Sequence, residues 1–363
     1  MKLRRILLVI GVIYVFLLLS PIAGLDVPHV AETIVNQPKL VLRYLIIGIA
    51  NGGIFAIIAL GYTMVYGIIE LINFAHGDVW MMSTFMGLTV IALMGTTNKS
   101  DPAQILITIL IALIIAVIFG GLLNMGIERL AYRRLRNAPR LAPLISAIGV
   151  SFILQNLGQI WAGQGYIDAL KPYFGTSGGA AQKAFPDLIP RVDVFSDVLH
   201  LPDVGVQLLT KELFVIVAAI LLMVGLRLFI QRTRLGKAMR ATAENRDAAK
   251  IMGINIDRII SITFLIGGGL AGAAAILNGL YVNTAWWLMG FQAGLRSFTA
   301  AVLGGIGNVT GAMLGGFMIG ILTSLSDGLL DPAWTRAWVF SVLVLVLVFR
   351  PTGLLGESVG QKA

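Results

Sequence analysis

The feature that most constrains this sequence is a series of ten apolar segments, most of them close to the length of a membrane span. About twenty apolar residues in a helix cross the roughly 30 Å hydrocarbon core of a bilayer. The chain is 57% hydrophobic and 12% charged, and a soluble protein of that composition would expose large apolar patches. The sequence therefore predicts an all-α polytopic membrane protein with about 8–10 transmembrane helices. The segments run over 6–25, 41–67, 78–96, 104–127, 143–161, 212–231, 259–281, 290–308, 311–330 and 335–349.

Lysine and arginine are distributed unevenly between the two sides that these segments define. With the N-terminus inside, seventeen of the 27 Lys and Arg residues fall in the inside segments 1–5, 128–142, 232–258 and 350–363, and seven fall in outside segments. An excess of positive charge on the cytoplasmic side is the rule for membrane proteins. It predicts that both termini are cytoplasmic and explains the net charge of +9 without nucleic acid as a partner. The basic connector 129–140 is then expected beside anionic membrane lipid.

Composition also limits the chemistry that the chain can perform. It has no cysteine, and its three histidines are far apart in the sequence, so neither a disulfide nor a metal site is expected. The only Gly-Lys pair, Gly236-Lys237, is followed by Ala238 instead of the Ser or Thr of a phosphate-binding loop. We therefore do not expect this chain to hydrolyse a nucleotide by itself.

The spans divide the chain into regions of different character. The first apolar segment resembles a signal peptide, but residues 21–24 make a poor cleavage site, so we expect it to be kept as an anchor helix. The long outside segment is rich in Gly, Pro and Asp, which predicts turns with one or two short elements. The predicted regions are 1–40, an anchor helix with a short periplasmic segment; 41–356, a transmembrane domain with a periplasmic loop at 162–211 and a cytoplasmic loop at 232–258; and 357–363, a cytoplasmic tail.

Glycine accounts for 42 of the 363 residues, and several glycines are four residues apart. That spacing lets helix backbones approach closely in lipid, where no hydrophobic force drives helices together. The run LGGIGNVTG, residues 303–311, also predicts a break between two spans. A mobile segment beside a transport path is the alternative interpretation. The glycines expected at helix contacts are Gly268, Gly272, Gly307, Gly311 and Gly315.

Residues 61–82, GYTMVYGIIELINFAHGDVWMM, bring four polar side chains together between two apolar spans. The pattern predicts a helix break, with Asn73 or Asp78 capping a helix that begins near Val79. A gate or part of a substrate path is the alternative, whereas a catalytic histidine–carboxylate pair would lack a nucleophile or metal. For Arg296, which lies deep in a predicted span, pairing with a helix end or a lipid phosphate is the alternative to a place on the path. The candidates for a translocation path or gate are Asn51, Glu70, Asn73, His76, Asp78, Asn278 and Arg296.

The inside loop 232–258 is polar and helix-prone, unlike most of the chain. Ala241, Ala248 and Met252 lie at helical spacing and form a small, shallow face that fits a groove, and Gly253 is a natural helix stop. The charged residues around this face would orient a partner. A solvated connector is the alternative. The residues expected to contact a partner are Ala241, Glu244, Asn245, Arg246, Asp247, Ala248, Met252 and Gly253.

Four stretches carry a resemblance to a known family. GYTMVYGIIELINFAHGD, RATAENRDAAKIMGINIDRI, LGGIGNVTGAMLGG and the ending RPTGLLG resemble, in the same order, permeases of bacterial branched-chain amino acid ABC transporters. The closest likeness is to the first permease subunit of the high-affinity importer, and it covers about residues 41–356. The chain departs from the family at Glu70, where a small residue is usual, and in a longer N-terminus and a longer segment 162–211.

The resemblance implies a function and a set of partners. The chain would be a multi-pass subunit in the bacterial inner membrane that moves branched-chain or similar apolar amino acids inward by alternating access. It would not be an enzyme, because ATP and Mg would bind to separate ATPase subunits and this chain would hold no cofactor. The implied partners are two ABC ATPases, which dock on the 232–258 loop, a homologous second permease and a periplasmic substrate-binding protein.

Two alternatives stay open at the level of the sequence. Permeases for urea, short amides or other amino acids look similar, so the substrate is not decided. An ion-coupled secondary transporter would need buried carboxylates or unwound ion sites on paired repeats, and the spans contain few charges.

Overall fold

The computed structural model describes residues 27–356, apart from 137, 140, 165–167, 176–177 and 201–204, and this part of the chain is mostly helical. The first half contains α2 (Val27–Asn36), α3 (Pro38–Ile69), α4 (His76–Leu93), α5 (Pro102–Ile127), α6 (Leu141–Ala162) and α7 (Thr210–Arg232). The second half contains α8 (Arg234–Glu244), α9 (Arg246–Ile251), α10 (Ile256–Val282), α11 (Met289–Gly304), α12 (Val309–Leu329) and α13 (Thr335–Phe349). Short turns of helix are η1 (Glu128–Tyr132), η2 (Arg133–Leu135), η3 (Lys171–Gly175), η4 (Val194–Val198) and η5 (Pro332–Trp334). The strands β1 (Lys183–Ala184) and β2 (Thr284–Ala285) form one antiparallel pair.

Seven helices in the described part are long and apolar enough to cross a membrane. They are α3, α5 with η1 and η2, α6, α7, α10, α12, and η5 with α13. The chain is therefore an all-α polytopic membrane protein, as the sequence predicted. Two further predicted spans are the shorter helices α4, which has a polar first turn, and α11, which has 16 residues. The predicted anchor at 6–25 lies outside the described residues.

Helix α3 is the centre of the bundle, and it packs against α7, α10, α11 and α12. Its first half presents glycine and alanine to α12, so the two backbones meet almost directly. A Cβ atom built on Gly52 would lie 2.7 Å from the Cα of Phe317, and one built on Gly320 would lie 2.2 Å from the Cα of Gly52. Close approach of this kind is how helices associate in lipid.

The glycines predicted at helix contacts pack in two further places. Gly268 and Gly272 of α10 lie against α5, where a Cβ on Gly272 would come within 2.2 Å of the Ala116 carbonyl oxygen. Gly311 and Gly315 of α12 lie against α11. The prediction of a helix contact is wrong for Gly307, because nothing lies near the position of its missing side chain.

The backbone explains the place of Gly307 in the sequence. It lies between α11 and α12 with a φ of +96°, a conformation that favours glycine. Gly305 in the same turn has a φ of +108°. The run LGGIGNVTG therefore forms the predicted break between two helices.

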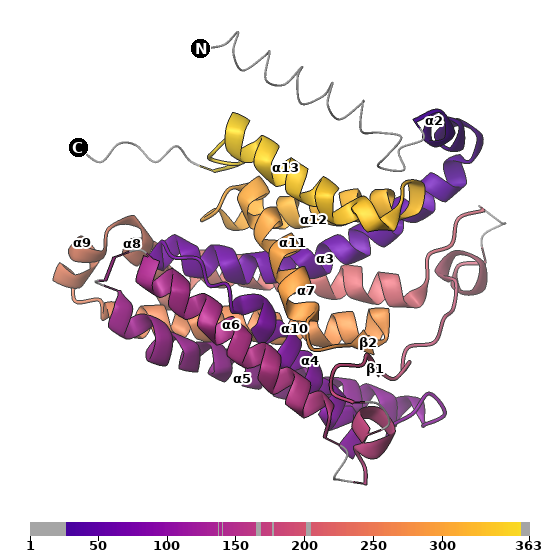
Figure 1. Cartoon of the computed structure of the whole chain (residues 1–363), viewed down its shortest axis with the longest axis horizontal. Helices are drawn as coiled ribbons and strands as arrows, with labels where there is room; N and C mark the ends of the chain where they lie inside the picture. Colours follow the sequence, from indigo (N-terminus) through magenta and orange to yellow (C-terminus); the bar gives the residue numbers. More distant parts are fainter. Residues whose placement is uncertain are drawn as a thin grey trace.

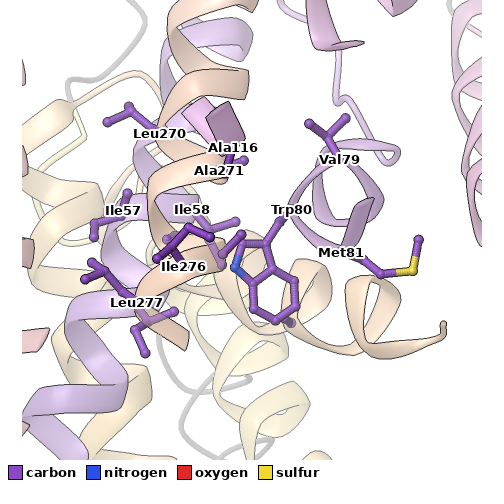
Figure 2. Close-up of a cluster of buried hydrophobic side chains, with 14 of the residues drawn as sticks. Ile57, Ile58, Val79, Trp80, Met81, Ala116, Leu270, Ala271, Ile276 and Leu277 are labelled. Carbon is purple, nitrogen blue, oxygen red and sulfur yellow. The ribbon is translucent and has the colours of Figure 1, made fainter. Parts of the chain in front are cut away.

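A hydrophobic core joins α3, α4, α5 and α10. Figure 2 shows Trp80 of α4 beside Ile58 of α3 and Ile276 of α10, and all three side chains are buried. By contrast, α5, α6, α7 and α13 carry many exposed leucine, isoleucine and valine side chains. That distribution is expected of helices that face lipid.

The two ends of the bundle differ in character (Figure 1). At one end, here named the basic end, lie α8 and α9, seen at the left of Figure 1. At the other, named the loop end, lie the described residues between 163 and 209, and β1 pairs with β2, so that Ala184 lies opposite Thr284. Lys183 of β1 is 2% exposed and donates hydrogen bonds to the carbonyl oxygens of Phe174 and Gly178, both at 3.2 Å. Burial lowers the pKa of this lysine.

Side-chain bonds also tie the loop end to the helices. Arg43 of α3 bonds the Glu212 carboxylate at the start of α7 at 2.5 Å. Lys211 donates to Asn283 Oδ1 at 2.7 Å and pairs with Asp187 of the loop. Because Asn283 ends α10, the loop is held directly on the turn between α10 and α11.

Candidate functional site

A cavity of about 200 Å³ lies between α3, α4, α10, α11 and α12. At about 30 Å³ per molecule in liquid water, this volume corresponds to about seven water molecules. One wall is apolar and aromatic: Ile54, Phe55, Trp80, Val282, Trp286 and Met289. The polar lining consists of Asn51, Asn278, Thr284, Gln292, Arg296, Thr323 and Asp327. Since Thr284 belongs to β2, the cavity borders the loop end.

Four of these polar side chains have no hydrogen-bond partner among the described residues: Asn51, Asn278, Gln292 and Arg296. All four side chains are half-buried, and polar groups of this kind bond water or a ligand where the protein offers no partner. The Arg296 guanidinium lies 5.9 Å from the centre of the Phe55 ring, an attractive but non-hydrogen-bonding contact. These four residues, named the cavity group below, have hydrogen-bonding capacity that the described chain does not use.

A second polar region lies deeper, where the chain re-enters the bundle after α3. Residues 70–75 are non-helical, and His76 at the start of α4 packs against Gly61 and the edge of the Tyr62 ring, with ring centres 4.8 Å apart. Gly61 lies eight residues before the end of α3, which corresponds to about 12 Å along the helix axis. Helix α4 therefore begins inside the bundle.

Irregular backbone at membrane depth is tolerated where protein groups satisfy it. Asn73 Nδ2 donates to Asn124 Oδ1 at 3.0 Å, and Asn124 Nδ2 donates to the Phe264 carbonyl oxygen at 2.8 Å. The Tyr132 hydroxyl bonds Asn73 Oδ1 at 3.2 Å and the Ile72 carbonyl oxygen at 3.3 Å. The re-entrant segment is thus tied to α5, η1 and α10.

Asp78 lies close by, fully buried in the first turn of α4. Ser151 of α6 donates to its Oδ2, and Gln155 Nε2 lies 3.4 Å from its Oδ1. A carboxylate in the first helical turn also gains from the helix dipole. With Asn73, Asn124 and Tyr132, these residues form what is named the closed network below.

The structure therefore separates the seven predicted path residues. Asn51, Asn278 and Arg296 line the cavity, whereas Asn73 and Asp78 belong to the closed network and His76 is buried against α3. Three details of the prediction are wrong. The helix begins at His76, its N-cap is Ala75 without a side-chain bond, and neither Asn73 nor Asp78 caps it.

The prediction that Glu70 lies on a path or gate is not supported by its position. It is exposed at the end of α3 with a φ of 56°, and it does not line the cavity. The sequence suggested a place on a path or gate because Glu70 is one of four polar residues between two apolar spans. The chain turns at this residue before it re-enters, so the carboxylate lies at the end of the helix.

The 232–258 loop folds as two short helices. Helix α8 ends at Glu244, and Asn245 caps α9 by accepting a hydrogen bond from the Ala248 N–H at 2.9 Å. Gly253, with a φ of +82°, follows the end of α9. The loop is therefore not one continuous helix. The residue that caps the start of a helix has a non-helical backbone, so α8 ends where Asn245 caps α9.

The residues proposed to contact a partner lie mostly on the surface. Those that are exposed are Ala241, Glu244, Asn245, Asp247, Ala248, Met252 and Gly253. Two large apolar side chains project at the tip, since Ile251 is 85% exposed and Met252 is 81% exposed. An exposed apolar pair on a polar loop is typical of a contact surface.

Arg246 joins these helices to the bundle. Its Nε and Nη2 both donate to the Ile68 carbonyl oxygen, at 3.0 and 2.5 Å. The last carbonyl groups of a helix lack partners within the helix, and a cation near a helix C-terminus is favourable. Helix α9 is therefore anchored to the end of α3, the helix that carries Asn51, Ile54 and Phe55 at the cavity.

The basic end also contains a buried carboxylate. Glu128 is fully buried, accepts a hydrogen bond from Ser261 Oγ at 2.6 Å and pairs with Arg136. Arg136 and Arg133 both bond Asp257, at 2.5 and 2.9 Å. This cluster joins the end of α5 to the start of α10.

Several residues of the site were not found from the sequence. Trp80, Trp286 and Asp327 line the cavity, and Ile251 projects beside Met252. Asp327 carried a usable signal, because it is an acidic residue within the predicted span 311–330. The two tryptophans carried none, since aromatic residues are common on any apolar helix.

Comparison with known proteins agrees with this architecture. Residues 44–348 match the family model described as "Branched-chain amino acid transport system / permease component". The high-affinity branched-chain amino acid transport system permease protein BraD of Pseudomonas aeruginosa is 41% identical over 324 residues, covering 88% of this chain and 97% of the relative. LivH of Escherichia coli K12, which has the same description, is 37% identical over 321 residues with the same coverage.

An archaeal relative is more distant. The probable branched-chain amino acid transport permease protein LivH of Methanocaldococcus jannaschii is 27% identical over 325 residues, covering 88% of this chain and 92% of the relative. No solved structure matches. The chain belongs to the branched-chain amino acid transport permease family, so it is a multi-pass membrane permease component of a transport system.

Proposed function

We propose that this chain is the membrane-spanning subunit of an ATP-driven importer that carries branched-chain amino acids inward by alternating access. The contact between Arg246 and the Ile68 carbonyl carries the proposal, because it connects an exposed pair of surface helices to the helix that lines the cavity. A partner that moves α8 and α9 would thereby displace α3. Membership of the family and the names of the relatives supply the substrate class.

The proposed partners follow from the two ends of the bundle. Two ATPase subunits, one on each of two permeases, would dock on α8 and α9 at the basic end. ATP and Mg would bind to those subunits and not to this chain. A periplasmic substrate-binding protein would dock at the loop end on residues 163–209. A second, homologous permease would complete the membrane unit, and lipid would cover the apolar outer helices.

The proposed orientation follows from the excess of Lys and Arg on one side of the membrane. The basic end and both termini would lie in the cytoplasm of a bacterial cell, and the bundle would lie in its inner membrane. Single cysteines at 134 and 246 should then react only with membrane-permeant reagents, and a cysteine at 180 should react from outside. The chain has no cysteine of its own, so each label reports one position. External labelling at 246 would overturn this orientation.

An ion-coupled transporter has less support. Three buried carboxylates, at Asp78, Glu128 and Glu212, each have protein partners: Ser151 and Gln155, Arg136, and Arg43. A carboxylate that carries an ion or proton would need to exchange such partners for solvent. No observation favours that exchange.

The proposal is tested at α8 and α9. Ala248→Trp, or the double charge reversal Glu244→Lys with Asp247→Lys, should abolish energised uptake while the permease still inserts, because these exposed side chains are not needed for spanning. Loss of a well-packed interface contact costs about 2 kcal/mol, roughly a thirtyfold loss of binding. The measurements are ATPase co-purification and uptake into proteoliposomes.

Ala103→Trp is the matched control, because Ala103 is exposed at the opposite end of the bundle. It should keep the ATPase and should transport normally. If the α9 variants also keep their ATPase and transport at the wild-type rate, residues 239–253 are a solvated connector and the proposal fails.

A further inference from the structure

Arg296 is the one member of the cavity group that carries a charge. A guanidinium at membrane depth is costly unless it is paired, and it usually marks a site of function. In the part of the chain that the structure describes, no hydrogen bond or ion pair is formed by Arg296; its guanidinium lies over the Phe55 ring and is attracted by the charge of Asp327. Its five donors are therefore available to a group in the cavity.

An acidic residue, Asp327, lines the same cavity and attracts Arg296 electrostatically without forming a direct ion pair. Asp327 accepts a hydrogen bond from Thr335 Oγ1 at 2.5 Å, and no ion pair joins it to Arg296 among the described residues. The cavity thus offers a cationic and an anionic group that are not in contact with each other. A molecule with both charges could bind between them.

The remaining lining of the cavity suits an apolar side chain of a bound molecule. The apolar part of its lining is aromatic and aliphatic and includes Ile54, Phe55, Trp80 and Val282. Small-molecule sites have this composition, in which an apolar wall supplies contact area and a few polar groups fix orientation. Urea or a short amide would need hydrogen-bond partners but would leave Arg296 without an anion.

We infer that Arg296 binds the carboxylate of the transported molecule, so that the cavity selects α-amino acids with a free carboxylate over amides and urea. This inference rests on the proposed function and adds its chemical selectivity. A guanidinium binds a carboxylate through two parallel hydrogen bonds. Asp327 faces the ammonium group of the same molecule, and the apolar wall receives its side chain.

A single-cysteine reporter tests this inference in the complete transporter. Ala293 lines the cavity and the chain has no cysteine, so Ala293→Cys labels this site alone. The rate of modification by methyl methanethiosulfonate is followed by the intact mass of this chain. L-leucine should slow modification at least fivefold, whereas leucinamide, which keeps the ammonium and the side chain but lacks the carboxylate, should slow it less than twofold.

Arg296 itself is tested in the same background. Arg296→Met should abolish protection by leucine and should lower ATP-driven leucine uptake at least tenfold while ATPase stimulation by loaded binding protein persists. Arg227→Met is the matched control, because Arg227 lies in a membrane helix but is exposed and does not line the cavity. It should keep protection and uptake.

The outcomes separate the inference from the proposed function. If the wild-type transporter takes up no branched-chain amino acid, the proposed function fails. If it takes up leucine but leucinamide protects the cysteine as well as leucine does, the carboxylate inference is overturned, and this comparison needs no Arg296 variant. Undiminished protection and uptake in Arg296→Met, or equal loss in Arg227→Met, would also overturn it.

Discussion

The closed network and the cavity group contain similar polar residues at membrane depth, but only the first is satisfied within the protein. Asn73 and Asn124 bond each other and the Phe264 carbonyl oxygen, whereas Asn51 and Asn278 bond nothing in the described chain. Asn51 and Asn278 are half-buried, so their amide groups are open to water or to a ligand in the cavity. The difference teaches that the closed network serves the fold, and it supports the proposal that the cavity group binds a ligand.

Close glycine contacts occur in both parts of the bundle, including those of α3 with α12 beside the cavity. In the closed part of the bundle, Gly268 and Gly272 bring α10 into backbone contact with α5. Around the cavity, larger side chains such as Phe55, Trp80 and Trp286 leave an open volume between the helices. The cavity is therefore an open volume between helices that elsewhere meet backbone to backbone.

The largest expected loss of stability is at the basic end. Arg136→Gln should lower stability by about 3 kcal/mol or more, because it leaves the buried Glu128 carboxylate without its cation. Arg133→Gln is the matched control, because it removes a bond to the same Asp257. Arg133 and Asp257 are 45% and 51% exposed, and exposed pairs of this kind contribute about 0–1 kcal/mol to stability. Thermal unfolding in detergent compares the two. Equal melting temperatures would show that Glu128 is not structurally paired.

A smaller effect is expected from glycine. Gly272→Leu should destabilise the bundle by about 1–3 kcal/mol, because the added carbon atoms would separate α10 from the Ala116 carbonyl. Gly315→Leu should act in the same way between α11 and α12. Gly225→Leu on α7, where nothing lies within 4 Å, should leave the yield and melting temperature unchanged. If all three variants assemble and transport normally, close backbone contact is not required.

The smallest effect concerns a single hydroxyl group. Tyr132→Phe removes the bonds to Asn73 Oδ1 and the Ile72 carbonyl oxygen and should cost about 1 kcal/mol. Tyr66→Phe is the control, because no hydrogen bond of the Tyr66 hydroxyl occurs in the described chain. Proteolysis of the region around residues 70–75 should become faster only in Tyr132→Phe. Equal rates in the two variants would mean that the hydroxyl does not hold the re-entrant segment.

Sequence patterns predicted the helices well, because apolar runs of membrane length can satisfy their backbone only as helices. The predicted segment 259–281 and the observed α10, Ile256–Val282, differ by three residues at one end and one at the other. The same logic failed at Glu70. A re-entrant chain is set by partners from other helices, such as Asn124 and Tyr132, which spacing along the sequence does not reveal.

The candidate site was predicted in part. Asn51, Asn278 and Arg296 were expected on a path because they are polar residues within spans, and they line one cavity. Asn73 and Asp78 are also polar residues beside apolar spans, yet they lie in the closed network. The sequence could not separate the two groups, because the distinction depends on whether a partner lies within hydrogen-bonding distance in three dimensions.

The most direct test of this account measures leucine uptake and thermal stability in the same preparations of Asn278→Leu and Asn124→Leu. The account predicts that Asn278→Leu keeps the wild-type melting temperature and loses at least tenfold in uptake. Asn124→Leu should lower stability by about 2–5 kcal/mol, because the Asn73 amide and the Phe264 carbonyl oxygen lose their partner. The opposite pattern, with a stable and transport-deficient Asn124→Leu and an unstable Asn278→Leu, would contradict the account.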